Sequence, residues 1–73
     1  MTYGDLIKKV RTEAGMTQKE FAEFIHTPVR TLQHWEINER KVPENVMRLM
    51  AYKLEMEKIA KDVNAQIDEC VPK

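Results

Sequence analysis

Glycine and proline are scarce in this chain, which holds only two glycines and three prolines in 73 residues. Because these residue types interrupt regular structure most strongly, their scarcity favours long helices with short connections over a sheet. Strict alternation of apolar and polar residues does not persist over any long stretch, and clusters of β-branched residues are missing. The sequence therefore predicts an all-α fold, and its length suffices for one small core.

The charge balance limits the kinds of partner that the chain can bind. Twelve Lys and Arg cancel twelve Asp and Glu, so there is no global positive field for unspecific coating of nucleic acid or of an anionic membrane. A local basic face is compatible with this balance. No apolar run approaches the ~20 residues of a membrane span, and residues 1–10 lack the pattern of a signal peptide. We expect a soluble, cytoplasmic protein with no membrane partner.

Capping residues and helical spacing predict three helices in the first half of the chain. The first spans about residues 2–13 and is followed by Gly15 as a stop. A capping box of Thr17 and Glu20 opens the second, and the third is expected at about residues 28–36. The inward-facing apolar residues of these helices are expected to be Leu6, Ile7, Val10, Ala14, Phe21, Ala22, Ile25, Leu32 and Trp35.

The second half of the chain holds a long stretch without helix-breaking residues. Nothing interrupts a helix between Glu44 and Pro72, so we expect one helix over this stretch, or two with a bend near Tyr52. The residues that continue the core face are expected to be Val46, Leu49 and Met50.

An apolar stripe continues beyond this core face at spacings of three and four, close to a heptad seam. Its members are Tyr52, Met56, Ile59, Val63 and Ile67. A free helix of this kind is marginal in water unless it packs on a partner or back on its own domain. We expect it to mediate homodimerisation. The chain is accordingly divided into a first domain, residues 1–51, and a helical extension, residues 52–73.

Two short helices joined by a tight turn, of which the second faces solvent, form a helix-turn-helix. The sequence here resembles the Cro/C1-type (XRE) helix-turn-helix family of phage and bacterial repressors, over about residues 6–50. The residues that carry the resemblance are Met16, Thr17, Gln18, Phe21, Ala22, Ile25, Thr31, Leu32, Gln33, Trp35, Glu36, Arg40, Lys41, Val42 and Pro43. The resemblance implies a lambda-repressor-like bundle of four to five helices, with a long C-terminal helix in this chain.

The chain departs from the family pattern at three places. His26 stands in the turn where the family usually has glycine, and Asn38 replaces the glycine of the following loop. The cap of the third helix is displaced to Thr27 and Pro28. Since His and Asn tolerate a positive φ better than most residues, the geometry of the turns is expected to survive.

The third helix carries the residues expected to read DNA bases. With Leu32 and Trp35 inward, the wheel turns Arg30, Gln33 and His34 outward. Arg can donate two hydrogen bonds to guanine, Gln can pair with adenine, and small apolar groups can touch the thymine methyl. The expected base-reading residues are Val29, Arg30, Thr31, Gln33 and His34.

Other polar residues around this motif are expected to contact the DNA backbone. The start of the second helix offers free N–H groups and a dipole that favour a phosphate, and the loop after the third helix is basic. The expected backbone contacts are Thr17, Gln18, Lys19, Thr27, Arg40 and Lys41. The resemblance further implies that Arg11 and Glu36 form a partly buried structural ion pair.

These features predict a sequence-specific DNA-binding transcriptional regulator, a repressor, that binds double-stranded DNA at an inverted-repeat operator as a homodimer. The alternative is an antitoxin-like or adaptor protein whose last helix binds a protein partner such as a toxin, with DNA binding secondary. A third reading keeps the fold as a scaffold that binds RNA.

Catalysis, cofactors and metals are not expected in this chain. It has no serine and no glycine-rich phosphate loop, and an enzyme would need such chemistry in a cleft. His26 and His34 lack further ligands at metal-binding spacing. Cys70 cannot form an internal disulfide. It is either a thiol that cross-links a dimer on oxidation or an idle surface thiol.

Overall fold

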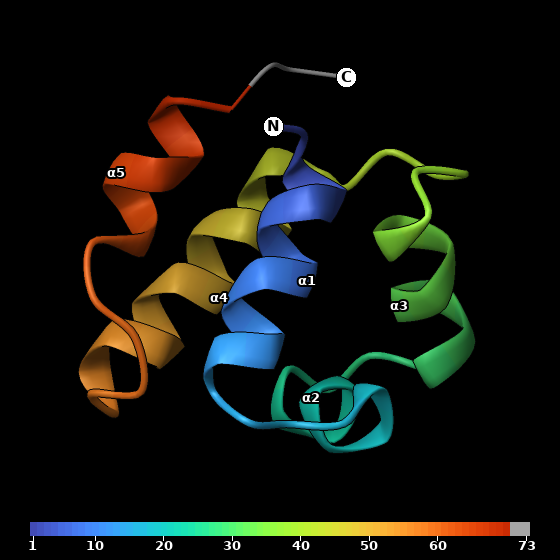
Figure 1. Ribbon diagram of the computed structural model, residues 1–73, viewed down its shortest axis with the longest axis horizontal. Helices are drawn as coiled ribbons and strands as arrows, with labels where there is room; N and C mark the ends of the chain where they lie inside the picture. The colour runs from blue at the N-terminus through green and yellow to red at the C-terminus, as the bar shows by residue number, and fades with distance from the viewer. Residues whose placement is uncertain (71–73) are drawn as a thin grey trace.

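Five helices follow one another in residues 1–70, the part of the chain that this computed structural model describes. They are α1 (Tyr3–Glu13), α2 (Gln18–Phe24), α3 (Val29–Glu36), α4 (Glu44–Met56) and α5 (Val63–Asp68). In Figure 1, α3 and α5 lie on opposite sides of α1. Here α3 packs on α1 and α2, whereas α5 packs on α4 and α1. No strand occurs in the described residues, which confirms the all-α prediction, and none of these helices is long and apolar enough to cross a membrane.

The first three helices begin and end close to the predicted positions. The hydroxyl of Thr17 accepts a hydrogen bond from the Glu20 N–H (3.1 Å), and the Glu20 carboxylate accepts one from the Thr17 N–H (2.9 Å), which completes the predicted capping box. Gly15 follows α1 with a φ of 75°, and His26 and Asn38 adopt φ values of 56° and 62°. All three predicted turn positions are therefore left-handed.

The core is continuous through all five helices. Its buried apolar residues are Leu6, Ile7, Val10, Phe21, Ala22, Leu32, Trp35, Val42, Met47, Met50, Ala51, Leu54, Val63 and Ile67. Ile25 packs at its edge and Ala14 is half-buried. The inward-facing residues predicted for the first three helices thus lie in the core or at its margin.

The predicted core face of α4 is corrected at one position. Leu49 is 67% exposed, and the buried residues of α4 are Met47, Met50, Ala51 and Leu54. Apolar residues occur on several sides of α4, so their spacing is compatible with more than one rotation of the helix. Packing against the other helices selects the rotation that buries Leu54 and leaves Leu49 in solvent.

The expected continuous last helix is wrong, and so is the alternative of a bend near Tyr52. The helix α4 runs through Tyr52 to Met56, and a turn over residues 57–62 then reverses the chain. Lys58 and Asp62 adopt φ values of 59° and 57° in this turn, at a cost of about 1–2 kcal/mol each. Burying a Val or Ile side chain gains about 1.5–3 kcal/mol. The free energy gained by burying the side chains of α5 thus offsets the cost of the two left-handed residues.

The apolar stripe expected at a dimer seam does not form one face. Val63 and Ile67 are 0% and 2% exposed within the chain's own core, and Ile59 packs against it half-buried. Only Tyr52 and Met56 face solvent, each 63% exposed. The boundary predicted after residue 51 falls inside α4, and Pro72, the predicted helix stop, lies outside the described residues.

Polar contacts from α4 hold α5 in place. The Arg48 guanidinium donates hydrogen bonds to Asp68 Oδ1 (2.6 Å) and Asn64 Oδ1 (3.0 Å), while Glu55 accepts one from the Asn64 N–H (3.0 Å). The hydrogen bond to Asp68 holds the pKa of Arg48 above its usual value. Cys70 follows α5 half-buried, and burial raises the pKa of its thiol. This lowers its reactive thiolate fraction.

Gly4 is the point of closest approach between α1 and the end of α3. A Cβ at this position would overlap the main-chain oxygen of Trp35 and lie 2.9 Å from Asn38 Oδ1. Gly4→Ala is therefore expected to lower the free energy of unfolding by about 1–3 kcal/mol, although alanine favours a helix. Urea denaturation measures this loss, with Lys8→Ala on the exposed side of α1 as control. Equal stability of both variants would contradict the close approach.

Candidate DNA-binding surface

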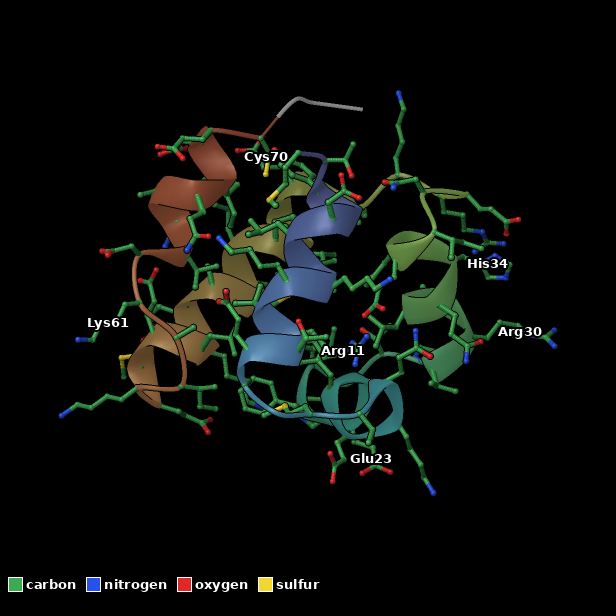
Figure 2. The ribbon with its side chains drawn as sticks, viewed as in Figure 1. Arg11, Glu23, Arg30, His34, Lys61 and Cys70 are labelled. Atoms are coloured by element: carbon green, nitrogen blue, oxygen red, sulfur yellow. The ribbon has the colours of Figure 1, made fainter. Side chains whose placement is uncertain are left out.

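The outward face of α3 is formed because Leu32 and Trp35 are buried beneath it. Figure 2 shows Arg30 and His34 pointing away from the body of the molecule. Arg30, Gln33 and Val29 are exposed, whereas His34 and Thr31 are half-buried. The five residues predicted to read bases therefore share one short helix, and the three longest polar ones lie on its accessible side.

The turn between α2 and α3 is closed by main-chain hydrogen bonds. The Thr27 N–H donates to the Ala22 carbonyl (2.8 Å), and the left-handed His26 makes this reversal possible. The Thr27 hydroxyl donates to the Ile25 carbonyl (3.3 Å). Pro28 then occupies the N-cap position of α3 with a φ of −59° and without a side-chain capping hydrogen bond. Thr27, predicted to contact the DNA backbone, thus lies half-buried directly ahead of α3.

A bidentate ion pair joins α1 to the end of α3. Arg11 Nε and Nη2 donate to the two carboxylate oxygens of Glu36, at 2.7 Å and 3.0 Å. Arg11 Nη1 also donates to the Met16 carbonyl (2.9 Å). The side chains of Arg11 and Glu36 are 12% and 2% exposed. This burial and the paired geometry give Glu36 a structural position, and they fix α3 relative to α1.

Gln18 extends this network to the surface. Its amide nitrogen donates to Glu36 Oε1 (3.0 Å), and its amide oxygen accepts a hydrogen bond from Gln33 Nε2 (3.3 Å). Sequence reasoning assigned Gln18 to a phosphate and Gln33 to a base, and it missed that the two amides touch. Their link orients the Gln33 side chain before any ligand arrives.

The His34 imidazole is held by an acidic residue that sequence reasoning did not single out. Its Nδ1 lies 2.6 Å from Glu39 Oε1. Since an ionised carboxylate only accepts hydrogen bonds, this contact places a proton on Nδ1 and leaves Nε2 to act outward. The left-handed Asn38 turns the chain back, so that the Glu39 N–H donates to the His34 carbonyl (2.9 Å). The sequence feature that could have indicated this contact is Asn38 in place of the loop glycine, because a left-handed residue at this position turns the chain back toward His34.

Exposed basic residues flank α3 at both ends. Lys19 lies in the first turn of α2, where Thr17 is occupied as the cap, and Arg40 and Lys41 lie in the loop after α3. In Figure 1, α2 lies at one end of α3 and this loop at the other. Exposed cations therefore stand at both ends of the residues predicted to read bases, interspersed with the exposed carboxylates of Glu20, Glu23 and Glu39. Cations at both ends suit contacts with two phosphate strands.

The loop after α3 is tied to the N-terminus of the chain. The Thr2 hydroxyl donates to Asn38 Oδ1 (2.7 Å), and Asn38 Nδ2 donates to Asp5 Oδ1 (3.1 Å). Hydrogen bonds from the Thr2 N–H and from Asn38 hold the pKa of Asp5 below its usual value. These contacts give the basic loop a fixed starting point.

The helix-turn-helix family model matches residues 7–55, from α1 through most of α4. The chain belongs to the Cro/C1-type helix-turn-helix family. This family provides DNA-binding domains of transcription regulators, and the chain is a DNA-binding regulator of that kind. The helix-turn-helix match stops before α5, although Val63 and Ile67 of α5 complete its core. No curated protein and no solved structure matches the chain.

Proposed function

We propose that this helix-turn-helix protein is a sequence-specific repressor that binds an inverted-repeat operator as a homodimer. The observation that carries the proposal is the outward face of α3, on which Arg30, Gln33 and His34 stand over a rigid base. The Arg11–Glu36 ion pair supplies that rigidity. Repression by occupation of the operator requires no catalytic site.

The base-reading residues have distinct roles in this proposal. Arg30 donates two hydrogen bonds to guanine, and Gln33, oriented by Gln18, pairs with adenine. His34 offers Nε2 as an acceptor when neutral, because Glu39 occupies Nδ1. Val29 and the Thr31 methyl reach thymine methyl groups.

The backbone contacts set affinity and register. Lys19 lies at the positive end of α2, whose dipole favours phosphate, and Arg40 and Lys41 grip a phosphate at the opposite end of α3. Thr17, Gln18 and Thr27 add neutral donors. These contacts carry no sequence information directly, so base choice rests on α3.

Selection of bound duplexes from a random DNA pool tests the proposal. We expect an inverted repeat whose half-sites lie about one helical turn apart, ~34 Å. Enrichment of single-stranded RNA in a parallel pool, with no enriched duplex, would replace this function by the RNA-binding reading.

Arg30→Ala is expected to weaken binding to the selected duplex by about 1–3 kcal/mol and to weaken binding to random DNA much less. The reason is that the loss of a bidentate base contact affects only the preferred sequence. Lys41→Ala serves as the matched control, because a lost phosphate contact weakens both duplexes about equally and reduces the salt slope by about one unit. Fluorescence anisotropy at several salt concentrations measures both. Equal losses for Arg30→Ala on both duplexes would make Arg30 a phosphate contact.

The alternative of an antitoxin-like or adaptor protein was based on a long apolar seam and on the neutral net charge. The structure uses Val63 and Ile67 of that seam inside the chain's own core. The seam is therefore no continuous surface for a toxin or for a second copy of the chain, and either partner would have to use the smaller exposed face on α4.

A further inference from the structure

A ridge of three apolar side chains projects from α4 into solvent. Leu49, Tyr52 and Met56 are 67%, 63% and 63% exposed. They are spaced by three and four residues, so they lie along one side of the helix. Contiguous exposed apolar residues of this kind mark interaction sites more often than scattered ones do.

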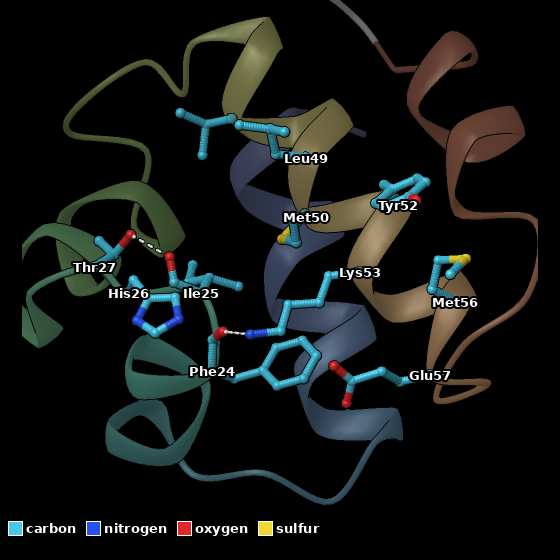
Figure 3. A pocket seen from close by; sticks show the side chains of 11 residues that line it. Phe24, Ile25, His26, Thr27, Leu49, Met50, Tyr52, Lys53, Met56 and Glu57 are labelled. Carbon is cyan, nitrogen blue, oxygen red and sulfur yellow. Dashed lines mark hydrogen bonds between the residues drawn. The ribbon is translucent and has the colours of Figure 1, made fainter.

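A groove of about 620 Å³ runs beside this ridge, as Figure 3 shows. Met50 and Lys53 of α4 form its floor, and Phe24 and Ile25 at the end of α2 form its far wall. Lys53 Nζ donates to the Phe24 carbonyl (2.6 Å) and lies 4.4 Å from the centre of the Phe24 ring. The Lys53 charge is therefore engaged within the molecule, and its methylene stem lines the groove.

We propose that this ridge and groove form the surface through which two copies of the chain pair on DNA, an inference that rests on the function proposed above. A ridge next to a groove on one face is self-complementary under two-fold symmetry, since each copy's ridge enters the other's groove. The two α4 helices then run antiparallel. Tyr52 lies nearest the axis, and Leu49 of each copy faces Met56 of the other.

The position of this face relative to α3 suits a dimer on DNA. In Figure 1, α1 lies in front of α4, whereas in Figure 3 it lies behind α4, so the ridge and groove face away from α1. Arg30 and His34 point in a third direction, to the side in Figure 2. A two-fold axis directed toward the DNA can therefore relate the two copies while both α3 helices face the same duplex.

The small area of the face determines when the pair forms. The 13 residues of α4 span ~20 Å, and a helix is ~10 Å wide, so with the end of α2 the face buries roughly 300–400 Å² per copy. A stable interface needs about 800 Å² per partner. The pair is consequently weak in free solution. Binding at adjacent half-sites holds the two copies at an effective concentration near ~1 mM, which favours the pair on DNA. The same area is too small for a tight complex with a different protein.

Binding to a duplex with two half-sites, compared with a duplex carrying one, tests the proposal. The parent is expected to sediment as a monomer at micromolar concentration without DNA. It is expected to occupy the inverted repeat as two copies, with the second copy bound at least ~10-fold more tightly than on a single half-site.

Charge variants at the proposed axis provide the decisive step. Tyr52→Glu and Tyr52→Lys each place like charges opposite one another in the pair, so each should lose the ~10-fold gain. An equal mixture of the two variants should recover it, because opposite charges then meet. Ala65→Glu and Ala65→Lys make the same charge changes at an exposed position of α5 and should keep the gain. On a single half-site, the Tyr52 and Ala65 variants that carry the same added charge should bind with affinities within about twofold of each other.

Three results would overturn this proposal while leaving the proposed function intact: independent filling of the two half-sites by the parent, an unchanged gain in the Tyr52 variants, or no recovery in their mixture. A tight complex between the parent and another protein through Leu49, Tyr52 and Met56 would also overturn it. Failure of the parent to bind even a single half-site would instead contradict the proposed function.

Discussion

Replacing Glu36 by glutamine is expected to lower the free energy of unfolding by about 3–5 kcal/mol, a large share of the ~5–15 kcal/mol typical of small domains. The Glu36 carboxylate accepts hydrogen bonds from Arg11 Nε, Arg11 Nη2 and Gln18 Nε2. An amide keeps one acceptor oxygen and turns an NH₂ group toward these donors. It also leaves the Arg11 guanidinium, only 12% exposed, without its counter-charge.

Urea denaturation of the parent and the variant measures this loss. Glu44→Gln is the matched control, because Glu44 pairs with Arg48 at the surface, 3.2 Å away, and is 63% exposed. An exposed pair of this kind contributes little, so the control should unfold like the parent. The double change Arg11→Met with Glu36→Leu should recover part of the loss, because no buried charge is then left unpaired. Parent-like unfolding of Glu36→Gln would show that the pair contributes nothing in solution.

The start of the chain was predictable because its signals are local. Thr17 and Glu20 lie three residues apart, and the hydrogen bonds of a capping box depend on little beyond that spacing. His26 and Asn38 stand where the family has glycine, and both are left-handed in the structure. Short-range backbone geometry of this kind does not require knowledge of the tertiary contacts.

The end of the chain was not predictable in the same way, because the decision is made by long-range packing. Lys58 carries no sequence signal for a left-handed turn, and Asp62 carries only the weak one that Asp tolerates a positive φ, yet both adopt one. What determines the turn is the burial of Val63 and Ile67 against distant parts of the core. Periodicity alone placed these residues on one stripe with Tyr52, and it could not tell which neighbour would cover them.

The candidate site shows the same division. Residue types and the wheel placed Arg30, Gln33 and His34 on the outer side of α3, where the structure has them. The side-chain partners of Gln33 and His34 escaped sequence reasoning, because Gln18 and Glu39 approach them across a turn and a loop. The face that α3 exposes follows from its apolar pattern, whereas the rotamers on that face depend on neighbours from other elements.

Val63→Asp is expected to unfold the chain at room temperature. Val63 is fully buried, and α5 packs on both α4 and α1. The change removes about 1.5–3 kcal/mol of apolar burial and forces a carboxylate into the core, where an unpaired charge is far more costly than an unpaired neutral polar group. Together these terms approach the whole stability of a small domain.

Tyr52→Asp is the matched comparison, because both residues belong to the apolar stripe that the sequence presents as one seam. Tyr52 is 63% exposed, and surface substitutions usually change stability by no more than ~0.5 kcal/mol. Circular dichroism during thermal denaturation should therefore give a cooperative transition for Tyr52→Asp and none for Val63→Asp. If α5 instead left the core to extend α4, the two variants would melt alike and Val63→Asp would stay folded. The contrast between the two variants thus distinguishes an α5 that packs in the core of its own domain from one that extends α4 and packs on another molecule.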